Sequence, residues 1–113
     1  MYLYENIYVK KETIRNYYKF QPGSAPAFEY WIKKVKESGW SHPGDIRDTF
    51  RTADLLGRGS QRVVFDIGGN NYRMICRYFF GEKQVWLYIC WLGTHAEYDK
   101  LCAGNGQYTV WNF

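Results

Sequence analysis

The chain has 113 residues, of which 46% are hydrophobic and 20% aromatic, and its net charge is +4. This composition fits one domain over residues 1–113 and excludes a disordered chain, because it supplies enough apolar surface for a core. The positive charge favours a polyanionic partner such as nucleic acid, and the lack of a signal peptide or membrane-length apolar segment predicts a soluble, cytoplasmic protein.

The N-terminal half has helical character. A short strand is expected within residues 6–11, and a helix over 10–20 that ends before a Gln-Pro-Gly stop. Residues 24–39 predict a second amphipathic helix, because four apolar residues recur at helical spacing: Phe28, Trp31, Ile32 and Val35. Its lysines form either a solvated face or an RNA contact. Residues 41–50 predict a turn with a short helical segment, and residues 51–61 predict a loop.

Residues 62–92 change to strand periodicity and predict three strands joined by tight turns at Gly69–Asn70 and Gly81–Glu82. Pairing across these turns places only apolar residues opposite one another on one face. The pairs are Ile67–Tyr72, Phe65–Met74, Val63–Cys76, Cys76–Leu87, Met74–Ile89 and Tyr72–Trp91. This face is expected to meet the helices.

The opposite face of these strands is predicted to be open, basic and aromatic. Its residues are Arg62, Val64, Asp66, Arg73, Ile75, Arg77, Trp86, Tyr88 and Cys90. Phosphate contacts together with stacking rings are typical of single-stranded RNA recognition. The alternative is a surface charge network in which Arg73 pairs with Asp66 across the strands.

The last predicted strand is followed by Gly-Thr-His-Ala-Glu-Tyr-Asp-Lys, residues 93–100. In the predicted pairing this segment emerges beside residues 70–72, with Thr94 capping a short helix. Arg73, His95 and Tyr98 then converge. An arginine stabilises phosphate charge, a histidine transfers protons at neutral pH, and a tyrosine stacks, donates a hydrogen bond or, with a lowered pKa, transfers a proton. Each side chain also has a purely structural interpretation.

Other kinds of site find little support. Three cysteines, Cys76, Cys90 and Cys102, are too few and too scattered for a disulfide framework, and no Cys/His cluster suggests zinc. No metal and no cofactor are therefore expected. The second histidine, His42, lies in a Ser/Pro/Gly turn and is assigned no role.

The segments "RVVFDIGGNNYRMICRYFF" and "VWLYICWLGTHAEYDKL", together with "WIKKVKESGW" and "DIRDTFRTADLL", resemble the HigB toxins of bacterial type II toxin–antitoxin systems, within the RelE-like superfamily. The resemblance covers roughly residues 8–101. It implies an α+β fold in which two N-terminal helices pack on one face of a small, mainly antiparallel twisted sheet, with a short C-terminal helix or tail.

The resemblance also implies an mRNA endoribonuclease that acts at the ribosome and inhibits translation. Its partners would be mRNA, the ribosome and a HigA-like helix-turn-helix antitoxin, through which alone it would bind operator DNA. Arg73, His95 and Tyr98 match the catalytic positions, and Gly68 and Gly69 match the turn. The RNA-binding candidates are Arg62, Arg77, Lys100 and Asn71.

Two rival functions stay open at this stage. One is a non-enzymatic DNA gyrase poison on the same fold, as in ParE-like toxins, and the other is an RNA-binding module without turnover. The tail after Leu101 also leaves two options open. Residues 107–113 could add an edge strand, or the tail could cover part of the antitoxin-binding surface.

Overall fold

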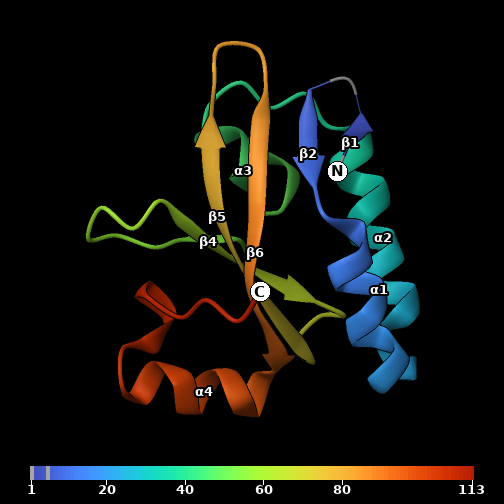
Figure 1. Ribbon diagram of the computed structural model, residues 1–113, viewed down its shortest axis with the longest axis vertical. Helices are drawn as coiled ribbons and strands as arrows, with labels where there is room; N and C mark the ends of the chain where they lie inside the picture. The colour runs from blue at the N-terminus through green and yellow to red at the C-terminus, as the bar shows by residue number, and fades with distance from the viewer. Residues whose placement is uncertain (1, 5) are drawn as a thin grey trace.

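A twisted mixed sheet organises the chain in the computed structural model, which describes residues 2–4 and 6–113 (Figure 1). Its six described strands lie in the order β1-β2-β6-β5-β4-β3. The strands are β1 (Tyr2–Tyr4), β2 (Ile7–Val9), β3 (Asp54–Leu55), β4 (Arg62–Ile67), β5 (Tyr72–Phe80) and β6 (Val85–Thr94). Only β2 and β6 pair in parallel, so the expectation of a mainly antiparallel sheet is confirmed.

Three helices pack on one face of this sheet. The helices of the fold are α1 (Lys11–Phe20), α2 (Ala25–Glu37), α3 (Gly44–Thr49) and α4 (His95–Ala103), with short 3-10 turns η1 (Pro22–Ser24) and η2 (Gly106–Tyr108). Ile14, Trp31 and Ile46, one from each of the first three helices, are buried in the core with Val63 and Phe65 of β4. Each such side chain contributes about 1.5–3 kcal/mol by its burial. The predicted α+β class and the two N-terminal helices are confirmed.

The β4–β5 hairpin has the predicted register. Val63 pairs with Cys76, Phe65 with Met74 and Ile67 with Tyr72. Gly68 and Gly69 both adopt positive φ angles, 65° and 66°, which glycine tolerates without a Cβ clash. The tight turn between the two strands therefore has the residues that its backbone requires.

The predicted register of the β5–β6 hairpin is wrong. Its loop spans residues 81–84 and is closed by a hydrogen bond from the Gly81 amide to the Gln84 carbonyl (2.7 Å), so Cys76 pairs with Ile89 rather than Leu87. A bulge then adds Cys90 between the pairs Cys76–Ile89 and Ile75–Trp91. An added residue reverses the sides to which later side chains point, so Trp91 leaves the main core.

Helix α4 and the C-terminal tail cover part of the face that was predicted to be open. Val64, Ile75, Cys90 and Trp91 form a second buried cluster, packed against Leu56, Tyr98, Leu101 and Val110. The tail is held by the Asn112 amide, which donates to the Cys90 carbonyl (2.8 Å) at the bulge. Figure 1 shows the tail crossing the sheet. Residues 107–113 therefore do not add an edge strand.

Candidate active site

The candidate site lies where β5 begins, β6 ends and α4 starts. Tyr72 pairs with Thr94 and Arg73 with Gly93, and the His95 amide donates to the Asn71 carbonyl (3.0 Å). The predicted approach of residues 93–100 to residues 70–72 is confirmed, although the pairing on which it was based was wrong.

A capping box starts α4 at this point. The Glu97 amide donates to the Thr94 hydroxyl (3.2 Å), and the Thr94 amide donates to the Glu97 carboxylate (2.8 Å). A Cβ atom on Gly93 would clash with the Trp91 ring, so glycine allows that ring to lie beside the start of the helix. The predicted Thr94 cap is confirmed, and it fixes the direction in which His95 and Tyr98 leave the backbone.

Arg73 is buried and held on three sides. Its Nε lies 3.0 Å from the Asp66 carboxylate, Nη1 donates to the Tyr72 carbonyl (3.0 Å), and Nη2 donates to the Asn70 side chain (2.7 Å). The cross-strand ion pair left open by the sequence is therefore present. These bonds fix the guanidinium plane, and its remaining N–H groups are the ones available to a phosphate.

His95 is the most accessible of the three predicted catalytic side chains, with 40% of its side chain exposed. Its Nδ1 lies 3.4 Å from a carboxylate oxygen of Asp99, one turn later on α4, but makes no hydrogen bond. Nδ1 is buried, so the other ring nitrogen is the one that can exchange a proton with a substrate.

Tyr98 is half-buried, and its ring packs on Trp91 with centroids 6.0 Å apart. Burial raises the pKa of its hydroxyl well above the ordinary value, and a hydrogen bond with Cys102 raises it further, whereas the nearby Arg73 charge lowers it. Tyr98 is therefore neutral at physiological pH. The condition for a proton-accepting tyrosine, a lowered pKa, is not met, and hydrogen-bond donation and stacking remain.

Tyr17 of α1 was missed by sequence reasoning. Its hydroxyl oxygen is buried without a hydrogen-bond partner, and burial, with added repulsion from Glu97 and Tyr72, raises its pKa to about 12. The helical pattern of residues 10–20 marks Tyr17 as apolar but gives no sign that its ring lies against Tyr72. The contact between these two rings, with centroids 6.5 Å apart, places the Tyr17 phenol beside the start of β5.

The four RNA-binding candidates separate into two regions. Asn71 is exposed beside His95, and Lys100 is exposed on α4, where it lines a hollow with Trp91 and Asn112. Arg77 is exposed farther along β5 and donates to the Gln61 side chain (3.2 Å). Asn71 and Lys100 therefore lie on the same segments as the predicted catalytic residues, and Arg77 lies apart from them.

The placement of Arg62 on an open surface is wrong. Only 4% of this residue is exposed, because its guanidinium donates to the tail carbonyls of Val110 (2.6 Å) and Gln107 (3.2 Å). It also lies over the Trp111 ring, 5.6 Å from the centroid. Arg62 fastens the tail to the sheet and is not available to a phosphate.

The described residues offer neither a metal-binding cluster nor a membrane-spanning helix. Within residues 2–4 and 6–113, no three His, Cys, Asp or Glu side chains gather as metal ligands do. The same part of the chain contains no helix that is both long and apolar enough to cross a bilayer. Cys76, Cys90 and Cys102 are free thiols.

Comparisons with known proteins agree with this geometry. Residues 24–101 match the family model of HigB_toxin, described as the RelE-like toxic component of a toxin-antitoxin system. The chain is also 33% identical over 91 residues to the mRNA interferase HigB of Escherichia coli O6:H1 (strain CFT073), an alignment that covers 80% of this chain and 82% of that protein. The chain belongs to the HigB toxin family.

Proposed function

We propose that this HigB-family toxin inhibits translation by cutting mRNA on the ribosome, through a site formed by Arg73, His95 and Tyr98. One observation carries the proposal: a partly exposed histidine, with its Nδ1 3.4 Å from Asp99, lies at the start of α4, where Arg73 pairs with Gly93. The similarity to a protein named mRNA interferase supports the same reaction class.

The reaction requires few groups. The 2′-hydroxyl loses its proton and attacks the adjacent phosphorus, the bond from phosphorus to the 5′-oxygen breaks, and that oxygen gains a proton. His95 transfers one of these protons, and Arg73 offsets the charge on the phosphoryl oxygens. Neutral Tyr98 donates a hydrogen bond to the 2′-hydroxyl or stacks on a base. Asn71, Lys100 and, farther away, Arg77 hold the RNA chain.

The test uses ribosomes programmed with a defined mRNA, followed by mapping of new 5′ ends inside the reading frame. His95→Ala should lower cleavage by about 10²–10⁴-fold, the usual contribution of a general acid or base. The matched control is His42→Ala, because His42 is also exposed and lies 3.2 Å from an aspartate, Asp45, but on the α3 turn.

The same variants separate this proposal from its rivals. A gyrase poison does not need His95 or Tyr98, so growth arrest by the His95→Ala, Tyr98→Phe double variant would contradict the nuclease. A binding module without turnover would leave the mRNA intact at every toxin concentration.

We further propose that the toxin is neutralised in the cytoplasm by a HigA-like antitoxin with a helix-turn-helix domain. This proposal rests on membership of a family of toxin-antitoxin components. Co-expression with the adjacent small gene product should restore growth, and the purified complex, but not the toxin alone, should bind the operator DNA.

A further inference from the structure

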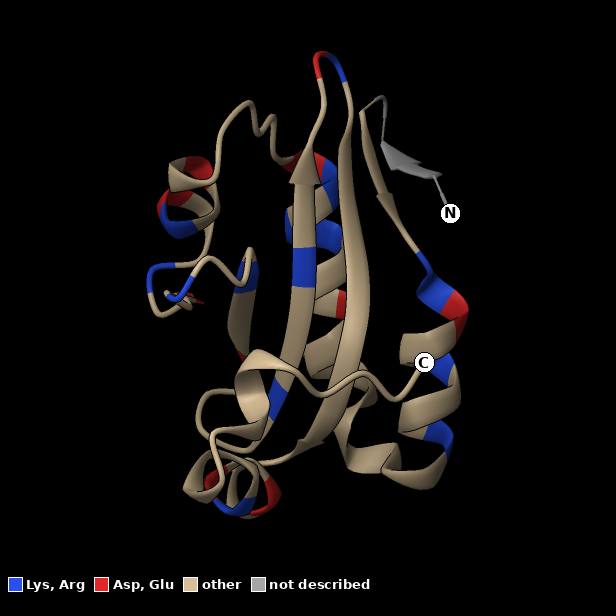
Figure 2. Cartoon of the chain, turned by 60° about the vertical axis from the view of Figure 1, so that its left-hand side comes forward, with Lys and Arg blue, Asp and Glu red and all other residues tan. Residues whose placement is uncertain are grey.

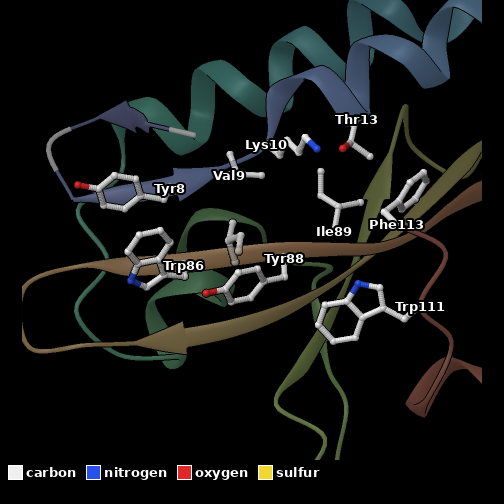
Figure 3. A pocket seen from close by; sticks show the side chains of 10 residues that line it. Tyr8, Val9, Lys10, Thr13, Trp86, Tyr88, Ile89, Trp111 and Phe113 are labelled. Atoms are coloured by element: carbon white, nitrogen blue, oxygen red, sulfur yellow. The ribbon is translucent and has the colours of Figure 1, made fainter.

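Four aromatic rings follow one another across the part of the outer sheet face that the tail leaves open. We call Tyr8, Trp86, Tyr88 and Trp111 the aromatic row; they come from β2, β6 and the tail (Figure 3). The centroid of Trp86 lies 4.3 Å from that of Tyr8 and 6.5 Å from that of Tyr88. Trp111 continues the row 6.4 Å beyond Tyr88.

Three of the four rings share an orientation, and Trp111 is tilted by 41° from Tyr88. The planes of Tyr8 and Trp86 differ by 15°, and those of Trp86 and Tyr88 by 8°. Tyr88 and Trp111 are neighbours, yet each remains 46% exposed to solvent. Two neighbouring rings exposed to this extent on a small domain are consistent with a binding surface.

The charges around the aromatic row indicate which kind of ligand would bind there. Two hollows, of about 420 and 350 Å³, flank the row, and they are lined by Lys10 and Arg77 respectively. Among the described residues that line them there is no Asp or Glu. Figure 2 shows that β6 carries no charge, while β5 carries positive charge only. Ring faces with flanking cations suit an unpaired base and its phosphate, whereas an acidic peptide would use the cations only.

The row also lies within reach of the candidate active site. Tyr88 pairs with Arg77, four residues along β5 from Arg73, which corresponds to about 13 Å of extended strand. Between them the tail covers the sheet around Ile75. An RNA held at both places would cross the tail.

We propose that the aromatic row is a stacking platform for unpaired bases of single-stranded RNA, with Lys10 and Arg77 contacting its phosphates. This rests on the proposed function only for identifying that RNA as the substrate of the toxin. Because every base has a stacking face, the platform binds with little sequence preference. It would hold mRNA outside the site at which His95 acts.

The test is a binding titration of the full chain with a short single-stranded 2′-O-methyl oligonucleotide, which lacks the attacking hydroxyl and is not cut. The substitutions Trp86→Ala and Tyr88→Ala should each weaken binding roughly tenfold. Trp86→Phe and Tyr88→Phe keep a ring and should bind almost as the parent does. The matched control is Tyr30→Ala, an exposed ring with Lys34 beside it on α2, which should not change binding.

Tryptophan fluorescence gives a second readout. Trp31, Trp40 and Trp91 are buried, so quenching by stacked bases should report Trp86 and Trp111. Single strands should quench and duplexes should not, and Trp86→Phe should remove part of the quenching without loss of affinity. Replacing Lys10 or Arg77 by Gln should each lower the slope of log K against log salt by about 0.7.

Three outcomes would overturn the platform: unchanged RNA affinity in the alanine variants, equal quenching by duplex RNA, or loss of antitoxin binding with RNA binding intact. The last would make the row a protein-binding surface. Cleavage on programmed ribosomes is followed in parallel. A protein that binds RNA through the row but leaves mRNA intact would overturn the proposed function and not the platform.

Discussion

At the residue scale, Arg73 is both a candidate phosphate contact and a structural anchor. It links Asp66, Asn70 and the Tyr72 carbonyl where β5 begins. Loss of toxicity in an Arg73 variant therefore does not by itself show a catalytic role. Stability and activity have to be measured on the same protein.

We expect Arg73→Gln to lower the free energy of unfolding by about 1.5–3 kcal/mol, because it removes charged hydrogen bonds from a buried group. Arg77→Gln, on the same strand and face, is the control and should stay within about 0.5 kcal/mol of the parent, because Arg77 is exposed. Urea unfolding measures both. Equal destabilisation by the two substitutions would contradict the anchoring role of Arg73.

Substitution of Tyr17 should raise the free energy of unfolding, in contrast to Arg73→Gln. Its buried hydroxyl has no partner, so Tyr17→Phe should raise stability by about 1–3 kcal/mol, the cost of desolvating an unpaired polar group. Tyr18→Phe is the matched control and should not stabilise, because the Tyr18 hydroxyl donates to Glu29 (2.6 Å). If Tyr17→Phe stabilises the fold but impairs mRNA cleavage, the unpaired hydroxyl serves the site.

At the scale of elements, α4 depends on its cap. Thr94→Ala should lower stability by about 1 kcal/mol because it removes the side-chain acceptor of the Glu97 amide, and Thr94→Ser should preserve it. In hydrogen exchange, the amides of α4 should lose protection before those of the sheet. Uniform loss of protection across β4–β6 would instead mean that the cap supports the whole sheet.

The strands show where sequence reasoning succeeds and where it stops. The β4–β5 register was predictable because Gly68 and Gly69 mark a tight turn and only one register pairs apolar residues. The β5–β6 register was not, because Gly81 gives no measure of loop length and an alternating apolar run does not reveal an added residue such as Cys90. The approach of residues 93–100 to residues 70–72 was still predicted correctly, because it requires only that the end of β6 lies beside the start of β5.

At the scale of the whole molecule, the tail completes the fold. Its residues follow no apolar periodicity, so its path over Val64 and Ile75 could not be read from the sequence. Its contacts depend on a buried arginine, Arg62, and on the carbonyl of the bulge residue Cys90. The Arg62 side chain and the Cys90 carbonyl reach the positions needed for these contacts only after the sheet has formed.

Removal of residues 107–113 should therefore expose Cys90 to a thiol reagent. In a Cys102→Ser background two thiols remain, Cys76 and Cys90, both buried and both with a pKa raised by burial, so the intact protein should react slowly. The shortened chain should label at Cys90, while Cys76 in the main core is the internal control. Labelling of both would mean that the domain opens as a whole.

Stability should also fall at alkaline pH. Tyr17 and Tyr98 have pKa values raised by burial, so folding favours their neutral forms. The stabilisation from these neutral tyrosines is complete below the pKa of an unfolded tyrosine, about 10. It is lost as the pH rises through the pKa values of the two groups in the folded protein. Denaturant midpoints from pH 8 to 11.5 should decline from about pH 10, and the Tyr17→Phe, Tyr98→Phe double variant should flatten that decline.

The parallel pairing of β2 with β6 has a consequence for biosynthesis. Residues Ile7–Val9 leave the ribosome first but find their partners, Val85–Leu87, only when most of the chain has been made. The nascent toxin therefore stays incomplete until the last strand, α4 and the tail have emerged. A chain that is still being translated therefore cannot yet assemble the candidate site, which needs β5, β6 and α4 together.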